Sequence, residues 1–513
     1  MDLPTGDLAS VVLGRAQEFG DRPALIEGSS GRLITYKQLA ERVRQFATGL
    51  HQRGFRKGDV FAIFCPNVPE YAVAFLGVAA VGGINTTVNS LYSTADLVHQ
   101  FKDSKAKFLL TIPAFLDRAL PAAKECNIEE VFVLGEAKGA TAFSHLLKND
   151  GVPPKVEINP KTDLVALPYS SGTTGLSKGV MLTHLNLISN MVLSCEMNPV
   201  DERDTMIGVL PFFHIYGMVL ILNLAIYRGT TLITVPRFEL RDFLEMVQEY
   251  RVTTLNLVPP LVLALSKHPL VDDFDLSCIR TIGCGAAPLG HELEQACAKR
   301  LNCKVYQGYG LTEVSGASHV LPLAEAKHKP GSVGPVLANT KCKIIDTHSG
   351  AELGINERGE ILLSGPHVML GYLNNREATT DSLDKDGWFH TGDIGYADED
   401  GYFYIVDRVK ELIKYKAYQV APAELEALLL SHPAIADAAV IPSPDEEAGE
   451  IPMAFVVLKT AISAAEIMQF IAERVAPHKK IRKLEFVKEI PKSASGKILR
   501  RILVEKERAS LAS

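Results

Sequence analysis

The chain has 513 residues, of which 47% are hydrophobic and 22% are charged, and its formal net charge is −7. This is the composition of an ordinary globular protein, so it excludes a fibrous or wholly disordered chain. The acidic balance disfavours a general nucleic-acid-binding surface. The eight cysteines are scattered without a CxxC pair, which disfavours a disulfide framework or a zinc site and favours a reducing compartment.

The N-terminal segment MDLPTGDLAS lacks the basic and apolar regions of a secretory signal. The longest apolar runs are too short to cross a bilayer. We therefore expect a cytoplasmic protein without a membrane span and without a nucleic-acid partner. A basic cluster at Lys479, Lys480, Arg482 and Lys483 is more typical of a solvated face than of a binding site.

The first three-fifths of the chain has an α/β pattern. Apolar runs predict buried strands at residues 59–65, 106–112, 130–135, 230–235, 253–258 and 279–285. Residues 241–250 lie between two of these runs and place Phe243, Met246, Val247 and Tyr250 on one helical face. Strands that alternate with helices predict an α/β fold with parallel-rich sheets and helices on both sides.

The pattern changes after residue 331. Short strands with turn signals at 341–347, 359–365 and 401–407 predict a small antiparallel or barrel-like sheet. Strands at 437–442 and 452–459, together with helices at 422–432 and 463–475, predict a small α+β domain at the C-terminus.

A glycine- and hydroxyl-rich stretch, PYSSGTTGLSKGVMLTH, spans residues 168–184. Glycines let the backbone approach a ligand closely, consecutive amide groups can form an anion-binding concavity, and Lys178 adds a positive charge. The stretch follows an apolar run, where parallel sheets bind ligands. It is not a Walker A loop, because Ser177 precedes the lysine and Gly179 follows it. The sequence predicts a phosphate-binding loop, and a flexible surface loop is the alternative.

Six further polar segments follow in order. They are PFFHIYG at 211–217, GCGAAPLG at 283–290, YQGYGLTE at 306–313, WFHTGDIG at 388–395, VDRVKELIKYKAYQVAP at 406–422 and PKSASGKILRR at 491–501. With the glycine-rich stretch, they resemble the adenylate-forming superfamily of acyl-CoA synthetases, firefly luciferase and peptide-synthetase adenylation domains. The resemblance covers nearly the whole chain, and the sequences of the segments are most similar to those of the branch of 4-coumarate:CoA ligases and related acyl- and aryl-CoA ligases.

The resemblance implies a ligase with two half-reactions. A carboxylate attacks the α-phosphate of Mg·ATP to give an acyl-adenylate and pyrophosphate, and the thiol of coenzyme A then displaces AMP. ATP, Mg²⁺, coenzyme A and a carboxylic acid are the implied cofactor and substrates. The implied domains are an N-terminal ATP- and acyl-binding domain at 1–406, with its antiparallel subdomain at approximately 331–406, a hinge at 407–410 and a mobile C-terminal domain at 411–513. We expect a monomer or a weak homodimer.

The resemblance also implies roles for individual residues. The catalytic residues are Lys497, Lys414 and His214, and the metal ligand is Glu313. The nucleotide-binding residues are Ser170, Ser171, Gly172, Thr173, Thr174, Gly175, Lys178, Gly285, Ala286, Ala287, Gln307, Gly308, Tyr309, Gly310, Thr312, Asp393, Arg408 and Lys410. The acyl-binding residues are His214, Tyr216, Met218, Gly285, Gly308, Ser315, Gly316, Ala317 and Gln419. The CoA-binding residues are Arg237, Lys416 and Ala417.

One position departs from the family pattern, which strongly prefers glycine where this chain has Ala417. A methyl group there narrows the expected path of the pantetheine arm, so an enzyme with a weakened CoA step is one alternative. The expected substrate is a 4-coumarate- or cinnamate-type aryl acid, and a medium- or long-chain fatty acid is the second alternative. A non-catalytic nucleotide-binding protein and a carrier-protein-loading adenylation domain are further alternatives.

Overall fold

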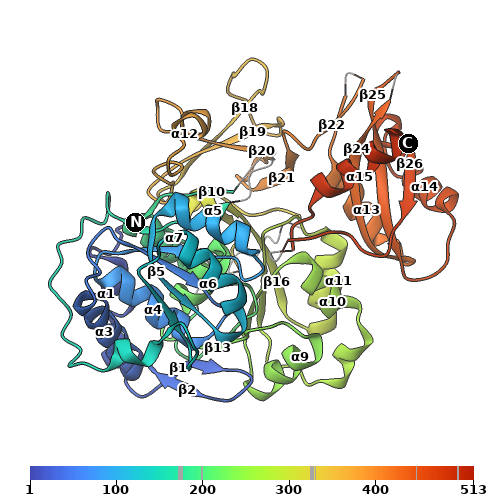
Figure 1. Ribbon diagram of the computed structural model, residues 1–513. Helices are drawn as coiled ribbons and strands as arrows, with labels where there is room; N and C mark the ends of the chain where they lie inside the picture. The colour runs from blue at the N-terminus through green and yellow to red at the C-terminus, as the bar shows by residue number, and fades with distance from the viewer. Residues whose placement is uncertain are drawn as a thin grey trace.

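The computed structural model describes residues 1–512 except 171–176, 198–199, 324–328, 330, 417, 446 and 494–495, and only the backbone at 419, 511 and 512. Figure 1 shows a large N-terminal body, a small sheet above it and a separate C-terminal unit beside both. Within the described part, no helix is long and apolar enough to cross a membrane.

The first large sheet has eight strands in the order β17-β16-β15-β14-β12-β13-β1-β2. Pairing from β1 through β13, β12, β14 and β15 to β16 is parallel, and the two edge strands β2 and β17 pair antiparallel. The strands are β1 (Pro23–Glu27), β2 (Leu33–Thr35), β12 (Thr205–Gly208), β13 (Thr231–Thr234), β14 (Thr254–Leu257), β15 (Thr281–Cys284), β16 (Lys304–Leu311) and β17 (Gly316–Val320).

The second large sheet has seven strands in the order β11-β8-β4-β3-β5-β6-β7, parallel except for β11 against β8. The strands are β3 (Val60–Phe64), β4 (Ile84–Thr87), β5 (Ala106–Thr111), β6 (Glu130–Val133), β7 (Thr141–Ala142), β8 (Leu164–Ala166) and β11 (Leu182–Thr183). All six buried strands expected from the apolar runs are present in these two sheets, as β3, β5, β6, β13, β14 and β15.

Helices join and cover the two sheets. They are α1 (Leu8–Val12), α2 (Ala16–Phe19), α3 (Tyr36–Gln52), α4 (Pro69–Ala80), α5 (Thr94–Ser104), α6 (Leu116–Glu125), α7 (His184–Met197), α8 (Leu224–Arg228), α9 (Leu240–Glu249), α10 (Pro259–Lys267) and α11 (His291–Leu301), with short turns η1 (Pro113–Phe115), η2 (Phe143–Leu147), η4 (Pro269–Asp273) and η5 (Thr312–Val314). Residues Tyr216–Asn223 form η3, a π-helix with i→i+5 bonds.

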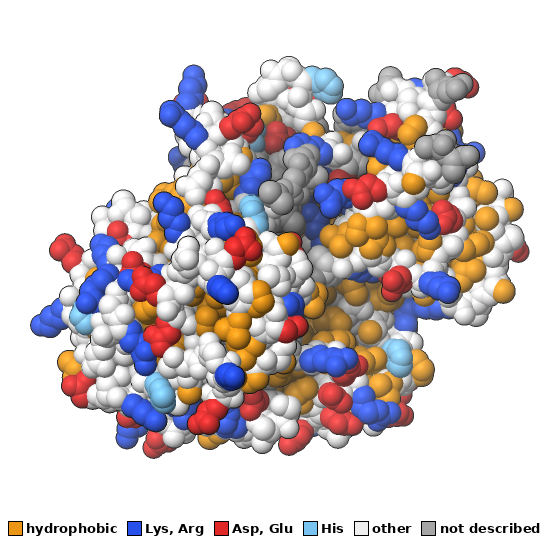
Figure 2. All heavy atoms as spheres, viewed as in Figure 1, with side chains coloured by type: hydrophobic (Ala, Val, Ile, Leu, Met, Phe, Trp, Pro, Cys, Tyr) orange, Lys and Arg blue, Asp and Glu red, His pale blue; other side chains and the backbone are white. Residues whose placement is uncertain are grey.

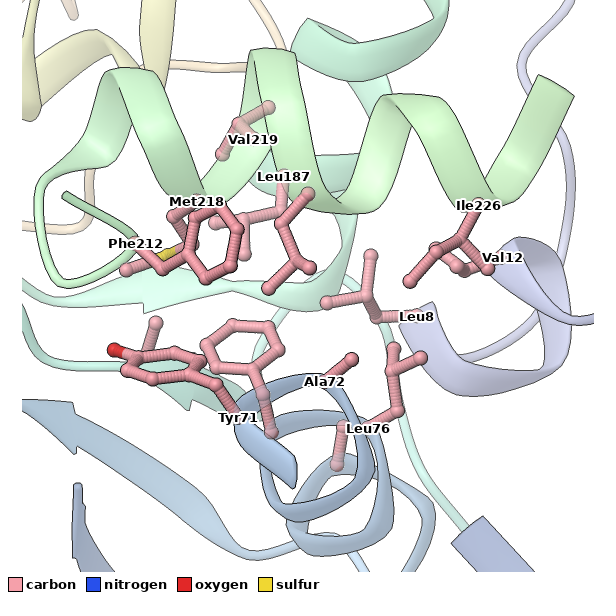
Figure 3. Packing of buried hydrophobic residues seen from close by; sticks show 14 of the residues in the cluster. Leu8, Val12, Tyr71, Ala72, Leu76, Leu187, Phe212, Met218, Val219 and Ile226 are labelled. Carbon is pink, nitrogen blue, oxygen red and sulfur yellow. The ribbon is translucent and has the colours of Figure 1, made fainter. Parts of the chain in front are cut away.

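Helix α4 lies between the two large sheets, because it contacts β1 of one sheet and β3 and β4 of the other. It is apolar on all sides, which is typical of a fully buried helix. Figure 3 shows Tyr71, Ala72 and Leu76 of this helix facing Phe212 and Met218 across the core. The two sheets therefore share one hydrophobic core, which gives the cavity described below a rigid base.

The third sheet is antiparallel, as the short strands after residue 331 predict. Its order is β18-β19-β20-β21. The strands are β18 (Lys341–Ile345), β19 (Gly359–Ser364), β20 (Phe389–Ala397) and β21 (Phe403–Arg408), with helix α12 (Arg376–Ser382) beside β20. Strand β20 contains residues 389–395 of the segment WFHTGDIG, which was predicted to belong to a site but not to a strand.

The C-terminal unit has its own sheet, in the order β23-β22-β25-β24 with β26 beside β25. Its elements are β22 (Ile413–Tyr415), β23 (Tyr418–Val420), α13 (Pro422–Ser431), β24 (Ile435–Asp445), β25 (Gly449–Leu458), α14 (Ala464–Ala472), η6 (Pro477–Lys479), β26 (Lys483–Phe486) and α15 (Arg500–Ala512). Both predicted strands and both predicted helices of this unit are present. The α/β fold class is confirmed, while the domain boundaries and the hinge stay predictions.

Candidate active site

A cavity of about 1620 Å³ opens where the first large sheet, the four-stranded sheet and the C-terminal unit meet. Its lining combines the carboxyl ends of parallel strands with β20, β21, Lys492, Ser493 and residues 497–502. In Figure 2 the surface is hollowed between the large body and the C-terminal unit, and Lys and Arg side chains stand beside the hollow. This is the position in an open α/β sheet where ligands bind.

Both ends of the predicted phosphate loop enter the cavity. Ser170 in β9 (Tyr169–Ser170) pairs antiparallel with Lys178 in β10 (Lys178–Gly179). The Lys178 ammonium lies 4.8 Å from the ring centroid of Tyr372, and Ser170 Oγ donates a 2.9 Å hydrogen bond to Glu313 Oε1. The loop residues between these strands lie outside the described residues, namely Ser171, Gly172, Thr173, Thr174 and Gly175.

Glu313 lies in the cavity wall beside the phosphate loop. Its Oε1 accepts hydrogen bonds from Ser170 and from Tyr372 Oη, the latter at 3.0 Å, and no described residue donates a hydrogen bond to Oε2. The described residues contain no group of three or more His, Cys, Asp or Glu that could hold a metal alone. One carboxylate fits Mg²⁺, which is commonly held by one or two carboxylates together with substrate phosphates and water.

Asp393 of β20 forms a second polar cluster at the cavity. Tyr309 Oη donates to its Oδ2 at 2.6 Å, and Arg408 Nε of the neighbouring strand β21 lies 3.2 Å from its Oδ1. Burial raises the pKa of Asp393, while the Arg408 charge opposes that rise. Burial and the adjacent carboxylate raise the pKa of Tyr309 well above its usual value, so its hydroxyl stays a donor. The cluster presents a carboxylate that can accept hydrogen bonds from hydroxyl groups of a ligand.

Lys497 reaches the same cavity from the C-terminal unit. Its amide donates to Ser493 Oγ at 3.1 Å, and its carbonyl accepts from the Ser493 amide at 2.8 Å, so the loop closes on itself. Burial and the charge of Arg408 lower the pKa of the Lys497 ammonium. Asp393 and Glu411 favour the charged form and limit this fall. The C-terminal unit therefore places the Lys497 ammonium in the cavity close to Arg408 and Asp393 of the N-terminal part.

His214 and Tyr216 form one wall of the cavity beside Gly285. Burial and the Lys497 charge lower the pKa of His214 to about 4, so its imidazole is neutral at neutral pH. His214 Nδ1 accepts from the Tyr216 amide at 3.3 Å, which leaves the proton on Nε2. A Cβ at Gly285 would lie 3.2 Å from the Tyr216 ring. Strand β14 contributes Asn256, 3.5 Å from Tyr216 Oη.

Gly310 shows why this wall uses glycine. A Cβ at Gly310 would lie 1.8 Å from the backbone oxygen of Gly316 in β17, a distance that backbone atoms cannot tolerate. At Gly308 the nearest contact of a Cβ would be the His319 oxygen at 3.2 Å. We expect Gly310→Ala to lower the free energy of unfolding by about 3 kcal/mol or more, because β16 and β17 must separate. Gly308→Ala is the matched control with a smaller loss, and urea unfolding compares the two. Equal losses would contradict this account of the wall.

The cavity brings together most of the predicted nucleotide and acyl residues that the structure describes. Those that line it are Ser170, Lys178, His214, Tyr216, Gly285, Ala286, Gly308, Tyr309, Gly310, Thr312, Glu313, Gly316, Ala317, Arg408, Lys410 and Lys497. Asp393 is not part of the lining, but it contacts the lining residues Tyr309 and Arg408.

Besides Asp393, four predicted nucleotide and acyl residues with described side chains do not line the cavity. Gln307 donates to Glu294 and accepts from the Leu289 amide, Ser315 donates to the His367 carbonyl, Met218 is fully buried in the core, and Ala287 is absent from the wall. Their roles in binding stay predictions. In such roles these residues would act through their backbone atoms or through neighbouring residues.

The residues predicted to act in the CoA step lie away from the cavity. Lys414 and Lys416 are exposed, and Lys416 Nζ donates to Glu447 at 2.7 Å. The Arg237 side chain is 85% exposed and forms an ion pair with Glu239. Ala417 lies outside the described residues, as does the side chain of Gln419. The structure thus presents one face of the C-terminal unit, the one that carries Lys497, to the cavity.

Some cavity residues were not identified from the sequence. Tyr372 lies between β19 and α12 in a segment without a motif, and Glu411 lies inside a basic run in which the basic residues were predicted as site residues. Asn256 lies in the predicted strand at 253–258, where alternation could have placed it on the same face as Thr254, and Tyr306 is the first residue of the segment YQGYGLTE. Arg500 belongs to the segment around Lys497. Its closeness in sequence to a predicted catalytic residue is the signal that could have identified it.

Comparison with known proteins agrees with this geometry. The sequence profile described as AMP-binding enzyme matches residues 13–373, and that described as AMP-binding enzyme C-terminal domain matches residues 424–497. The chain belongs to the AMP-binding enzyme family. The predicted family is thereby confirmed.

A relative named 4-coumarate--CoA ligase 1 from Petroselinum crispum is 46% identical over 506 residues, covering 96% of this AMP-binding enzyme and 92% of the relative. A relative named 4-coumarate--CoA ligase 2 from Nicotiana tabacum is 45% identical and covers 98% and 95%.

Solved structures of related proteins have the same fold as this AMP-binding enzyme. An anthranilate CoA ligase, AuaEII, in complex with anthranoyl-AMP has a TM-score of 0.92 at 25% identity, covering 100% of this chain and 99% of its own. ATP-bound MatB from Rhodopseudomonas palustris has a TM-score of 0.89 at 27% identity, covering 98% and 99%.

Proposed function

We propose that this AMP-binding enzyme is an ATP-dependent acid–CoA ligase. It forms an acyl-adenylate and pyrophosphate, and then an acyl-CoA thioester and AMP. The observation that carries the proposal is the position of Lys497 in the wall of a cavity that also contains Glu313, Arg408 and the two described ends of the phosphate loop. Relatives named 4-coumarate--CoA ligase support it, because they are about 45% identical over nearly the whole chain.

The first half-reaction joins two anions, so positive charge is needed where they meet. A carboxylate oxygen attacks the α-phosphorus, and the bond to the pyrophosphate oxygen breaks. Lys497 bridges the carboxylate and the α-phosphate and holds the reactants in line. Thr312 lies near the α-phosphate. Mg²⁺, held by Glu313 and phosphate oxygens, would supply further charge neutralisation when bound.

The rest of the nucleotide occupies the remaining cavity residues. The residues from Ser170 to Gly175, together with Lys178, bind the β- and γ-phosphates. Asp393 accepts hydrogen bonds from the ribose hydroxyls, with Arg408 beside it and Tyr309 holding its second oxygen. The segment Gly285–Ala287 flanks the adenine, where larger side chains would collide.

The proposed substrate is a 4-coumarate- or cinnamate-type aryl acid. Tyr216 offers a ring face and edge to a flat group, and the small residues Gly285, Gly316 and Ala317 leave room for it. A medium- or long-chain fatty acid is the second candidate, because the same cavity is broad and apolar toward β12 and α8.

The second half-reaction needs another face of the C-terminal unit. Lys414 and Lys416 lie away from the cavity in the present arrangement, although the CoA step is expected to use them. We propose that the unit, at 411–513, rotates about the hinge 407–410 relative to residues 1–406, so that Lys497 leaves and the loop at 414–419 enters. Arg237 would then meet the nucleotide end of coenzyme A.

Ala417 is expected to limit the rate of that second step. We expect Ala417→Gly to raise the rate of thioester formation about tenfold or more, because removing one methyl group from a tight path relieves about 1–3 kcal/mol. The rate of adenylation should not change, since the first step uses the other face. Stopped-flow measurement of each half-reaction tests this. A variant with no gain in the CoA step would show that Ala417 does not obstruct it.

Pyrophosphate release with a panel of acids, with and without coenzyme A, tests the proposed function. Release with an aryl acid and thioester formation with coenzyme A are expected. No ATP turnover with any acid would favour the non-catalytic nucleotide-binding alternative, and adenylation without CoA transfer would favour a carrier-loading enzyme. We also propose a cytoplasmic location and a monomer or weak homodimer.

A further inference from the structure

A second cavity of about 540 Å³ lies directly behind the proposed acyl pocket. The two cavities share three lining residues, Val200, Thr254 and Tyr306. These side chains therefore form the partition between the acyl pocket and the second cavity. Other residues of the second cavity include Arg280, Thr281, Asn302 and Lys304.

Strand register explains why the two cavities lie next to each other. Across β14, β15 and β16, Asn256 pairs with Gly283 and Gly283 with Tyr306. Two residues earlier on the same strands, Thr254 pairs with Thr281 and Thr281 with Lys304. Residues two apart share one face of a strand, so the second row continues the floor of the acyl pocket about 7 Å toward the amino ends of the strands.

The partition rests on side chains rather than on backbone. The Tyr306 ring lies over Gly283, since a Cβ at Gly283 would come within 2.7 Å of its Cζ and Oη. Behind it, Thr281 Oγ1 donates to Thr254 Oγ1 at 3.1 Å. An acyl tail can pass such a partition by a change of side-chain rotamer, whereas a backbone wall would stop it.

The two cavities differ in charge. The acyl-pocket walls contributed by β12, β14, η3 and α8 are uncharged, namely Met206, Thr254, Asn256, Tyr216, Leu220 and Leu224. The second cavity has two cations. Arg280 is paired with the buried Asp204, and Lys304 Nζ donates to the Leu323 carbonyl at 3.3 Å. Lys304 is solvent-exposed, and among the described residues it has no carboxylate partner, so at the open end of the second cavity it can pair with a ligand carboxylate.

From this arrangement we infer a tail subsite that begins at the Thr254–Tyr306 partition and ends at Lys304. It accepts acids whose chain is longer than the aryl pocket and whose far end is a carboxylate. This inference rests on the proposed acid–CoA ligase function and narrows its substrate class. The reacting carboxylate stays at Lys497, and the second carboxylate pairs with Lys304.

A matched pair of substrates tests the subsite, dodecanedioate against dodecanoate. We expect the wild-type protein to use dodecanedioate with a kcat/KM about tenfold higher, since a charge-assisted contact forms only with the second carboxylate. Lys304→Met should abolish this preference, Lys304→Arg should retain it, and Lys299→Met is the control because Lys299 is exposed on α11 outside both cavities. Pyrophosphate release gives the rates, and calorimetry with AMP present gives acid binding without turnover.

The outcomes separate this inference from the proposed function. Turnover of 4-coumarate without any preference for dodecanedioate would overturn the tail subsite and leave the ligase function intact. A preference that survives in Lys304→Met would also overturn it. If no acid is turned over, the ligase function fails, and calorimetry still decides whether dodecanedioate binds more tightly than dodecanoate through Lys304.

Discussion

Replacing Lys497 with alanine is expected to slow acyl-adenylate formation about a hundredfold to a thousandfold, the usual effect of removing a group that stabilises transition-state charge. Lys497 places an ammonium of the C-terminal unit in the cavity, where it interacts electrostatically with Arg408 and Asp393. Without it, the carboxylate and the α-phosphate repel each other with less compensation. Single-turnover pyrophosphate release measures the loss.

The second half-reaction is the internal control for this variant. Thioester formation from a prepared acyl-adenylate should proceed at a near-normal rate, because the CoA step is expected to use the opposite face of the C-terminal unit. Lys488→Ala is the matched lysine control, since Lys488 is exposed and lies outside the cavity. Adenylation by Lys497→Ala at the wild-type rate would contradict the mechanism.

The lowered pKa of Lys497 adds a pH signature. Burial and Arg408 lower the pKa of this ammonium, so it loses its proton at a lower pH than an ordinary lysine does. The rate of adenylation should therefore fall as pH rises through the lowered pKa. Lys497→Arg should keep its charge throughout this range, so the basic limb of its pH–rate profile should disappear.

Periodicity predicted the elements of this protein well where one face or both faces of a strand are buried. The run that became β3 is apolar throughout and the one that became β5 is mostly apolar, and both are recognisable as buried strands for that reason. Strand β20 was missed because its segment FHTGDIGYA serves a binding site, and glycine and polar residues obscure its alternation. The π-helix η3 was not predictable, since its i→i+5 bonds leave no period of their own in the sequence.

The candidate site was predictable only through the order of its segments. Sequence spacing alone could not predict the hydrogen bond between Ser170 and Glu313, because these residues are 143 positions apart in the chain. Nor could it show that the Gln307 side chain turns toward Glu294 instead of the cavity, since that depends on the helix packed behind β16. The second cavity depends on strand register, which a sequence does not specify across crossover connections.

Arg500 is the centre of a buried ion network next to Lys497. Its Nη1 donates to Glu411 at 2.7 Å, its Nη2 donates to both carboxylate oxygens of Glu426 at 2.7 and 2.6 Å, and its Nε donates to the Val440 carbonyl at 3.2 Å. These contacts join the segment after β21, helix α13 and strand β24 to the start of α15. The network therefore fixes the loop that carries Lys497 to the body of the C-terminal unit.

We expect Arg500→Ala to lower the free energy of unfolding of the C-terminal unit by about 3–5 kcal/mol, because Glu411 and Glu426 are left buried without their partner. The adjacent Arg501→Ala is the matched control. The Arg501 side chain is 72% exposed and its ion pair with Glu505 spans 3.4 Å, so its loss should cost less than about 1 kcal/mol. Hydrogen exchange of α13 and β24, followed by mass spectrometry, measures both.

A second variant distinguishes the unpaired charge from lost packing. Adding Glu426→Gln to Arg500→Met should recover part of the stability, because a neutral amide replaces the stranded carboxylate. Adenylation should stay slow in this double variant, since Lys497 has lost the anchor that holds its loop three residues away. Equal protection of α13 in Arg500→Ala and Arg501→Ala would show that the network does not stabilise the C-terminal unit. Wild-type adenylation by the double variant would show that it does not position Lys497.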